Sequence, residues 1–357
     1  MFFSFLCRMV CRVMESWQRE LQQSIRTPEE LRTLFSWLTE GDIDAQQLFP
    51  VSITPHTIKL VKNADPSNPL VRMCLPSAQE CVVSDHERED PLCEKNHTPV
   101  PGLLHRYSDR VLLLVTSACA QHCRFCFRRC LKSTMTQGTD IPSAIKYLHA
   151  HPEVKEVILS GGDPLMLTDD LLESWCQTLC EVPTIERLRI HTRIPVVLPS
   201  RITPSFLEQC HRMHTKLPLT IVTHFNHPKE LAQENRLILE RLQGTGITLK
   251  NQSVLLRGVN DDATTLITLF QSLSTLGVEN YYLHQLDPAC GTRHFYVPIE
   301  KGKELMTQIR SQYPSLQLPR YVADIPSLGG KKDLEQEEVV EESPGVYRLS
   351  SFAHLLR

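Results

Sequence analysis

Apolar residues follow two different periods along the chain, and the change of period divides it into regions. In the first part they recur at helical spacing, and the stretch RTPEELRTLFSWL offers Thr27, Pro28 and Glu30 in the order of a capping box. Residues 64–100 are mostly polar and contain loop-forming stretches such as NADPSNP. Residues 1–100 are therefore expected to form a mostly helical N-terminal extension that ends in an irregular segment.

After this extension, short apolar runs alternate with amphipathic stretches of helical spacing. The apolar runs typical of buried strands are residues 110–117, 154–160, 185–192, 219–226, 247–256 and 278–286. A strand followed by a helix, repeated in this way, predicts a parallel sheet with right-handed crossovers. The fold class is thus α/β, and the pattern fits either a partial (β/α)6 barrel related to the TIM barrel or an open doubly wound sheet.

The predicted organisation has three parts: the extension, a barrel over residues 101–317, and a C-terminal segment over residues 318–357 that includes a final short strand, GVYRLSSF. In both candidate folds, catalytic residues gather where the strands end. Unusual residues cluster toward the carboxyl ends of the predicted strands here, which favours an enzyme: Cys119, Gly161, Arg193, His224, Gln252 and Asp287.

Charge and cysteine content narrow the function classes. The net charge of the 357 residues is −3, so no basic field indicates binding to nucleic acid or to an anionic membrane. The 13 cysteines form no disulfide framework, which is typical of a reducing cytoplasm. We therefore expect a cytoplasmic protein.

The chain begins with an apolar stretch, MFFSFLCRMVCRVM, that Arg8 and Arg12 interrupt. A membrane-spanning helix needs about 20 apolar residues, so this stretch is too short to span a bilayer. It is expected to be a frayed leader, or to precede a true start at Met9 or Met14, which leaves open whether residues 1–13 are translated.

The densest candidate chemistry lies in the stretch TSACAQHCRFCFRRC. Cys119, Cys123 and Cys126 form a C-x3-C-x2-C loop directly after the first predicted strand of the repeat, and a zinc knuckle, a redox dithiol and an iron–sulfur site are the alternatives. Three thiolates can bind three corners of a cubane cluster and leave one iron open, whereas zinc sites and most clusters take four ligands. Cys130 could be counted as a fourth ligand, but it follows two arginines, and a short helix expected after it would point it elsewhere. The spacing favours the cluster.

Three further motifs follow predicted strands or tight turns. Gly161 and Gly162 could expose backbone amides to a ligand. Lys331, directly behind two glycines, could form a Schiff base on a flexible loop, although a solvated turn is the alternative. Asp287 and Asp324 could share a proton or hold a cation, or one of them could cap a helix.

Arginines flank the cysteine loop at positions 106, 110, 128 and 129. Guanidinium groups suit phosphate and carboxylate, although Arg110 could equally end a strand. The stretch HFNHP suggests a metal by composition, but His224 has no carboxylate or third histidine near it in sequence. It is expected to line a pocket instead.

The chain resembles the lysine 2,3-aminomutase family of radical S-adenosylmethionine enzymes. The resemblance rests on the cysteine motif and on stretches that occur in order over roughly residues 20–332: VPGLLHRYSDRVLLLVT, CRFCFRR, SGGDPLMLTD, HTRIPVVLPSRI, HFNHPKEL, NQSVLLRGVND, YYLHQLD, HFYVPIEKG and DIPSLGGK. The implied fold is the partial (β/α)6 barrel with a short C-terminal cofactor-binding segment.

The resemblance also implies three cofactors, each with its own residues. The implied sites are a 4Fe–4S cluster on Cys119, Cys123 and Cys126; S-adenosylmethionine at Gly161, Gly162, Asp163, His224 and Gln252; pyridoxal phosphate on the catalytic Lys331 with Arg106 at its phosphate; and substrate at Arg128, Asp287 and Asp324.

The implied reaction moves the α-amino group of L-lysine from C2 to C3 by means of a 5′-deoxyadenosyl radical and yields β-lysine. The implied partners are L-lysine and a one-electron donor such as flavodoxin or ferredoxin, with a homodimer left open. Neither nucleic acid nor a membrane is expected as a partner.

The chain departs from the family pattern in ways that bear on its substrate. Phe125 stands where the family often has histidine, and the absence of cysteine after Cys290 predicts no structural zinc. The short chain favours the branch that acts on elongation factor P, whereas the presence of both Asp287 and Asp324 favours free lysine. We expect free lysine as the substrate, with elongation factor P as the alternative. A second lysine, Lys332, adjoins Lys331, and the choice of Lys331 rests on its place directly after the glycines. A non-catalytic iron–sulfur interaction protein is the remaining alternative.

Overall fold

The computed structural model describes residues 15–130 and 138–349. Three sequence predictions fall outside this part of the chain: the alternative starts, the short helix expected after Cys130, and the end of the last predicted strand.

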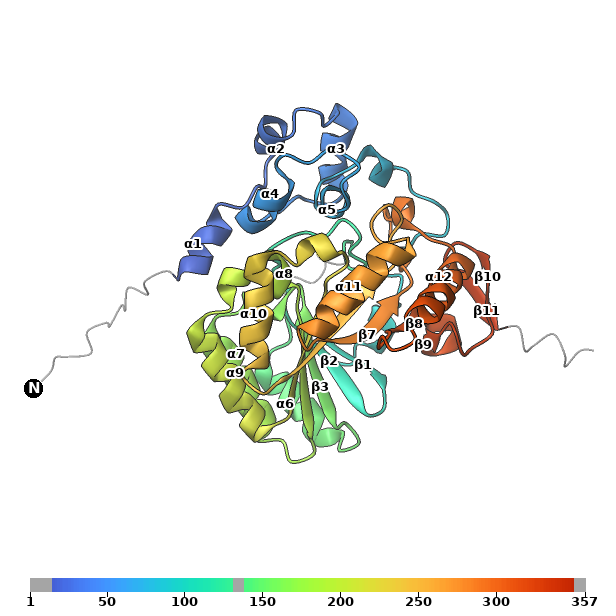
Figure 1. Cartoon of the computed structure of the whole chain (residues 1–357). Helices are drawn as coiled ribbons and strands as arrows, with labels where there is room; N and C mark the ends of the chain where they lie inside the picture. Colours follow the sequence, from blue (N-terminus) through green and yellow to red (C-terminus); the bar gives the residue numbers. More distant parts are fainter. Residues whose placement is uncertain (1–14, 131–137, 350–357) are drawn as a thin grey trace, which may run out of the picture.

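A nine-stranded sheet forms the centre of the molecule (Figure 1). The strands are β1 (Leu103–Tyr107), β2 (Arg110–Thr116), β3 (Glu156–Gly161), β4 (Arg187–His191), β5 (Leu219–Thr223), β6 (Thr248–Val254), β7 (Glu279–His284), β8 (Arg320–Ile325) and β9 (Gly330–Asp333). They lie side by side in chain order, parallel from β2 to β8, with β1 and β9 added antiparallel at the two edges. A doubly wound sheet would reverse its strand order part-way, so this order confirms the partial barrel.

Helices follow the strands, as the sequence predicted. They are α6 (Ile141–Ala150), α7 (Asp169–Cys180), α9 (Pro204–Lys216), α10 (Gln233–Gln243), α11 (Ala263–Thr275) and α12 (Ile299–Gln312), with the one-turn α8 (Ile194–Val197) after β4. Side chains accept hydrogen bonds from the first turns of α6, α7, α9 and α11, and these caps are Asp140, Thr168, Thr203 and Asp262. Between β5 and α10, Pro228–Glu230 forms a separate 3₁₀ turn, so α10 begins only at Gln233.

The N-terminal extension is helical, with α1 (Ser16–Gln22), α2 (Pro28–Leu34), α3 (Glu40–Leu48), α4 (Pro55–Val61) and α5 (Pro69–Cys74). The capping box at Thr27 and Glu30 is confirmed. The prediction that residues 64–100 are irregular is wrong at α5. There Asn68 caps the helix and Pro69 occupies its first position, a start signal that the polar composition obscured.

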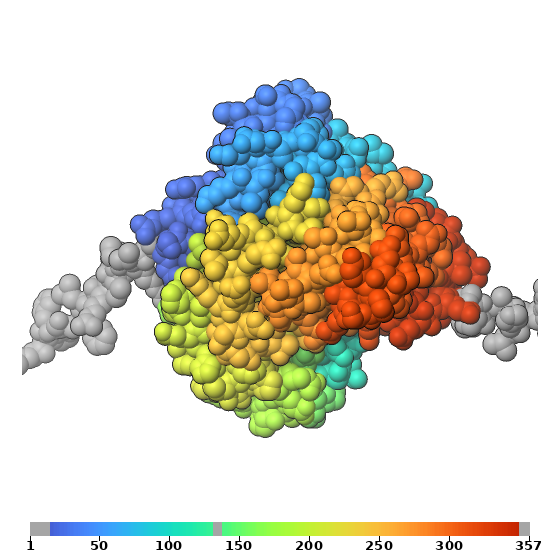
Figure 2. Space-filling model, viewed as in Figure 1, coloured from blue at the N-terminus to red at the C-terminus, as the bar shows by residue number. Residues whose placement is uncertain are grey.

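The extension packs over the ends of the strands where the cysteine loop lies (Figure 2). Its apolar side chains, such as Phe35 and Met73, share one core with Phe125 of the cysteine loop and with Leu286 after β7. This core is separate from the larger one between the sheet and its surrounding helices.

A buried carboxylate joins the extension to the cysteine loop. Glu80 accepts hydrogen bonds from Arg124 at 2.6 and 2.9 Å and from Arg129 at 2.5 Å, and all three side chains are buried. Arg124 also donates to the carbonyls of Phe49 and Pro50. The outer side of the loop is therefore fixed by residues that precede the barrel in sequence.

The C-terminal segment contributes more to the sheet than the sequence indicated. It supplies β8 and β9, and then a separate hairpin of β10 (Val339–Ser343) and β11 (Val346–Leu349). The final short strand was predicted, whereas β8 and β9 were not. No helix among the described residues is long and apolar enough to cross a membrane.

Replacing the buried Glu80 should destabilise the protein strongly. Glu80→Gln leaves two buried guanidinium groups without their carboxylate, so the free energy of unfolding in urea should fall by about 3–5 kcal/mol. Glu40→Gln is the control, because Glu40 makes a similar 2.6 Å contact with Arg32 in solvent and should change stability little. Equal effects of the two substitutions would contradict the assignment of Glu80.

Candidate active site

A cavity of about 530 Å³ opens where the parallel strands end. Every residue that the sequence assigned to a site contributes to its wall: Cys119, Cys123, Cys126, Arg106, Arg128, Gly161, Gly162, Asp163, His224, Gln252, Asp287, Asp324 and Lys331. Residues spread over more than 200 positions of sequence thus share one cavity.

The turn after β3 holds the start of the cysteine loop. The amides of Gly162 and Asp163 donate to the carbonyls of Thr116 and Ala118 at 2.7 and 2.8 Å. A Cβ at Gly161, whose φ is +131°, would lie 2.1 Å from the Thr116 carbonyl oxygen, and one at Gly162 would lie 2.2 Å from that of Ala118. The expectation that these glycines leave their amides free for a ligand is therefore wrong for Gly162, since its amide and the close packing serve the cysteine loop.

Asp163 connects this turn to the end of β4. Its carboxylate accepts hydrogen bonds from the Thr192 hydroxyl and the Arg193 amide, both at 2.7 Å, and from the Leu165 amide at 3.0 Å. Burial raises the pKa of Asp163 to about 6, against the effect of these donors. The side chain thus holds backbone in place, while its residue still contributes to the cavity wall.

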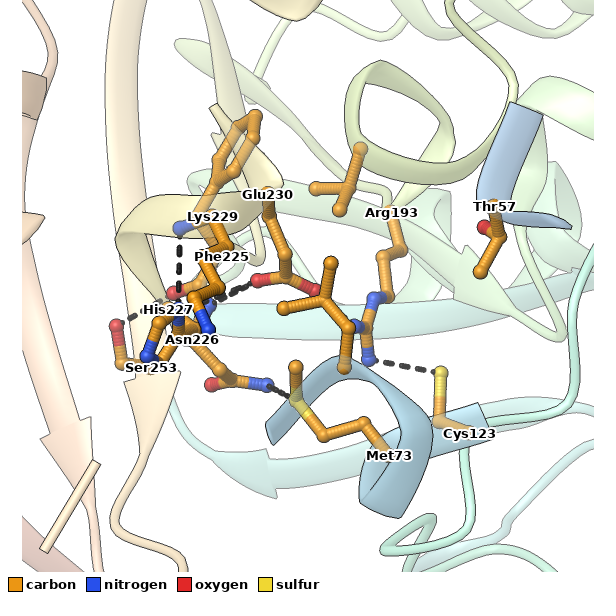
Figure 3. Close-up of polar contacts among 12 residues, drawn as sticks. Thr57, Met73, Cys123, Arg193, Phe225, Asn226, His227, Lys229, Glu230 and Ser253 are labelled. Carbon is orange, nitrogen blue, oxygen red and sulfur yellow. Dashed lines mark hydrogen bonds and ion pairs between the residues drawn. The ribbon is translucent and has the colours of Figure 1, made fainter. Parts of the chain in front are cut away.

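Arg193 reaches the cysteine loop from the end of β4. Its guanidinium donates to the Cys123 sulfur at 3.0 Å and to Glu230 at 2.5 Å (Figure 3), and it stacks 5.0 Å from the centre of the Phe125 ring. The sequence marked Arg193 only as an unusual residue at a strand end. The sequence did not indicate that Glu230 is its partner, because Glu230 lies in a different connection, the one that follows β5.

Arg128 lies in the cavity wall with its guanidinium already paired. Nη2 and Nε donate to Glu94 at 2.6 and 2.9 Å, and Nη1 lies 3.4 Å from the Ser160 hydroxyl. The sequence analysis assigned Arg128 to the substrate and did not identify Glu94, which lies in the polar segment that was predicted to be irregular. Only the Nη1 side is free of the carboxylate.

Lys331 lies on a strand rather than on the flexible loop that the sequence suggested. On β9 it faces Asp324 of β8 in register, and its Nζ is 2.5 Å from the Asp324 carboxylate. Its backbone amide donates to the Tyr107 hydroxyl of β1 at 2.9 Å. Lys332 lies outside the cavity and pairs with Glu337 at 3.1 Å, which favours Lys331 as the reactive amine.

The two predicted carboxylates interact with each other in the cavity. Burial, and then the charge of Asp324, raise the pKa of Asp287 to about 8. Asp324 is also 3.7 Å from Nδ1 of His284. Asp324 therefore pairs with the Lys331 ammonium. The raised pKa of Asp287 favours the protonated form of Asp287 near neutral pH.

Four histidines line the cavity, His97, His191, His224 and His284, and the sequence identified only His224. Burial, assisted by nearby cations, lowers the pKa of His224 to about 3 and that of His191 and His284 well below the usual value. The Nε2 atoms of His191 and His224 are buried without a hydrogen-bond partner. Neutral rings with unsatisfied nitrogens in a cavity wall are suited to a polar ligand.

The walls fit the cofactors that the sequence implied. The thiols of one short loop face the same cavity as Arg193, a suitable environment for thiolate ligands. At Lys331, a Cβ placed on the neighbouring Gly330 would lie 3.4 Å from Arg106, which donates to the Leu92 carbonyl. An amine and an arginine in the wall of one cavity suit an aldehyde cofactor that carries a phosphate.

Across residues 15–130 and 138–349, no three His, Cys, Asp or Glu side chains converge as a site for a single metal ion. A cubane cluster binds each thiolate through a different iron, so its ligands need not converge on one point.

Comparisons with known proteins identify relatives over nearly the whole chain, although no model of a protein family matches. The chain is 36% identical over 342 residues to an L-lysine 2,3-aminomutase of Acetoanaerobium sticklandii, covering 94% of this chain and 82% of that protein. An L-lysine 2,3-aminomutase of Escherichia coli is 39% identical over 328 residues, with coverage of 90% and 95%. The chain belongs to the lysine 2,3-aminomutase family. This confirms both the predicted family and the predicted isomerase class.

The close contact between Gly330 and Tyr107, which lies next to Lys331, should make the protein's stability sensitive to a side chain at position 330. A Cβ at Gly330 would lie 2.5 Å from the Tyr107 oxygen, so Gly330→Ala should lower the free energy of unfolding by about 1–3 kcal/mol. Gly329→Ala is the control, because Gly329 also has a positive φ but has no neighbour near its Cβ position. A larger loss in the control, measured by urea denaturation, would refute the contact's importance.

Proposed function

We propose that the protein is a radical S-adenosylmethionine aminomutase that depends on pyridoxal phosphate and moves the α-amino group of L-lysine from C2 to C3. The observation that carries this proposal is the single cavity that brings together the cysteine loop, Lys331 and a pair of carboxylates. A noncatalytic iron–sulfur protein would need no such combination.

In this proposal Cys119, Cys123 and Cys126 hold a 4Fe–4S cluster, and S-adenosylmethionine binds beside it. The residues assigned to S-adenosylmethionine are Gly161, Gly162, Asp163, His224 and Gln252. The unsatisfied Nε2 of His224 supports this assignment. Asp163 acts indirectly, because its carboxylate is occupied by the end of β4.

Lys331 is the residue proposed to bind pyridoxal phosphate, with Arg106 near the phosphate. When bound, the cluster and S-adenosylmethionine supply a radical that takes hydrogen, and pyridoxal phosphate supplies a ring that accepts electron density. The chain's own contribution is positional. Asp324 holds the Lys331 ammonium at 2.5 Å, and the Tyr107 hydroxyl fixes the backbone of the same residue.

The substrate is proposed to lie between the acidic pair and Arg128. Once Lys331 is no longer a free ammonium, Asp324 can pair with a different cation, and Asp287 lies close enough to interact with it. A buried ammonium needs opposing charge, and two carboxylates provide it. The Nη1 side of Arg128 is the part of that guanidinium available to the substrate carboxylate.

Free L-lysine is preferred over lysine for elongation factor P because Asp324 lies in the cavity wall, in contact with Lys331. Lysine for elongation factor P is the alternative substrate. A flavodoxin or ferredoxin as electron donor and a homodimer remain predictions.

The proposed reaction should be observed directly. Anaerobically reconstituted protein, given L-lysine, S-adenosylmethionine and dithionite, should form β-lysine, detected by mass spectrometry of derivatised amino acids. Lys331→Ala should abolish the visible absorbance of lysine-bound pyridoxal phosphate and reduce turnover by on the order of 10³-fold or more, because the tethering amine is lost.

Lys332→Ala is the matched control and should retain both the absorbance and the turnover. A parallel reaction with elongation factor P tests the second substrate. Turnover only in that reaction would reassign the substrate, whereas reduced protein that neither cleaves S-adenosylmethionine nor binds pyridoxal phosphate would refute the proposal.

The raised pKa of Asp287, about 8, predicts a pH dependence of lysine binding. Below this pKa, Asp287 of the substrate-free site is protonated. The ammonium group of the substrate favours the ionised form of Asp287, so binding releases the proton. Affinity should therefore increase with pH by up to about tenfold per unit below the pKa and level off above it. Calorimetric titration of the holoenzyme should show this dependence, and Asp287→Asn should lack it. A pH-independent dissociation constant for the unsubstituted protein would contradict the prediction.

A further inference from the structure

A guanidinium group contacts one of the cysteine sulfurs. Nη1 of Arg193 lies 3.0 Å from Sγ of Cys123, within the range of an N–H···S hydrogen bond (Figure 3). Arg193 follows β4 and Cys123 follows β2, so the contact links the segments after the two strands that flank β3.

Arg193 is held by hydrogen bonds from its guanidinium and from its backbone, although its Nε is buried without a hydrogen-bond partner. Its Nη2 donates to Glu230 at 2.5 Å, and the other Glu230 oxygen accepts from the amides of Asn226 and His227 at 2.6 and 3.1 Å. Its own backbone amide donates to Asp163 at 2.7 Å. Arg193 and Glu230 are 9% and 4% exposed, so the pair cannot turn toward solvent without disrupting the site.

The pair presents its positive end to the sulfur. The guanidinium lies between the Cys123 sulfur and the Glu230 carboxylate and donates a hydrogen bond to each. The Phe125 ring, whose centre is 5.0 Å from the guanidinium carbon, covers one face and excludes water there. Arg193 is thus a fixed cation with one N–H directed at Cys123.

We propose that Arg193 is a positioning residue that donates a hydrogen bond to the Cys123 thiolate and thereby raises the reduction potential of the bound cluster. The inference rests on the proposed function, in which Cys123 is a cluster ligand. Reduction adds one electron to the cluster and its thiolates. A donor and a positive charge at a ligand sulfur stabilise the more negative, reduced state.

The test compares variants that differ at this contact. Arg193→Met combined with Glu230→Gln removes the donor and its partner together, so that no buried charge is left unpaired. Arg201→Met combined with Asp169→Asn is the matched control, since it removes a 2.7 Å ion pair around a fully buried arginine that does not line the cavity and donates to the carbonyls of Leu165 and Leu167.

Each reconstituted protein is analysed for iron and acid-labile sulfide, for folding by circular dichroism, and for midpoint potential by a redox titration followed by electron paramagnetic resonance. The Arg193/Glu230 variant should retain its cluster but require a stronger reductant. The expected change in the reduction equilibrium is about tenfold, or about 59 mV for one electron. The control should match the unsubstituted protein.

An unchanged potential in a folded, cluster-loaded Arg193/Glu230 variant would overturn the inference while leaving the proposed function intact. If the unsubstituted protein binds no cluster, the proposed function fails first, and the inference fails with it. If the double variant does not fold, Arg193→Lys decides the matter. It keeps the charge but loses the fork that reaches both partners, so its potential should also fall, and an unchanged value would overturn the inference.

Discussion

The cavity depends on a single buried carboxylate, that of Asp163. Removing a charged group from water is costly unless donors surround it, and Asp163 meets that requirement with the Thr192 hydroxyl and the amides of Arg193 and Leu165. Its own amide donates to the Ala118 carbonyl. One residue therefore joins the ends of β2, β3 and β4, and it fixes the direction in which the Arg193 side chain leaves the backbone.

The opposite side of the cavity is held by contacts across the open edges of the sheet. β1 and β9 are not paired by backbone hydrogen bonds, yet the Tyr107 hydroxyl of β1 receives the amide of Lys331 on β9. The Lys331 side chain meets Asp324 on β8. The incomplete barrel thus brings its first and last strands together through one tyrosine, and this is the reason that a C-terminal segment can share a site with the cysteine loop.

The sequence predicted the parts whose signal is local. Buried strands such as β3 and β5 have continuous apolar runs, and the spacing of Cys119, Cys123 and Cys126 is visible in a single loop. It could not predict Glu230 as the partner of Arg193 or Glu94 as the partner of Arg128, because each pair forms only when separate segments meet. β9 was missed for a different reason. Glycine and lysine have low strand propensity, and only pairing with β8 makes these residues extended.

Two adjacent lysines on β9 are chemically equivalent, and strand geometry alone separates them. Neighbouring side chains of a strand point to opposite faces, so Lys331 faces the cavity while Lys332 meets Glu337 outside it. A slip of one residue against β8 would exchange their positions. Gly330, packed against Tyr107 where no larger side chain fits, opposes that slip. Which of the two amines faces the cavity is thus decided by a residue that has no side chain at all.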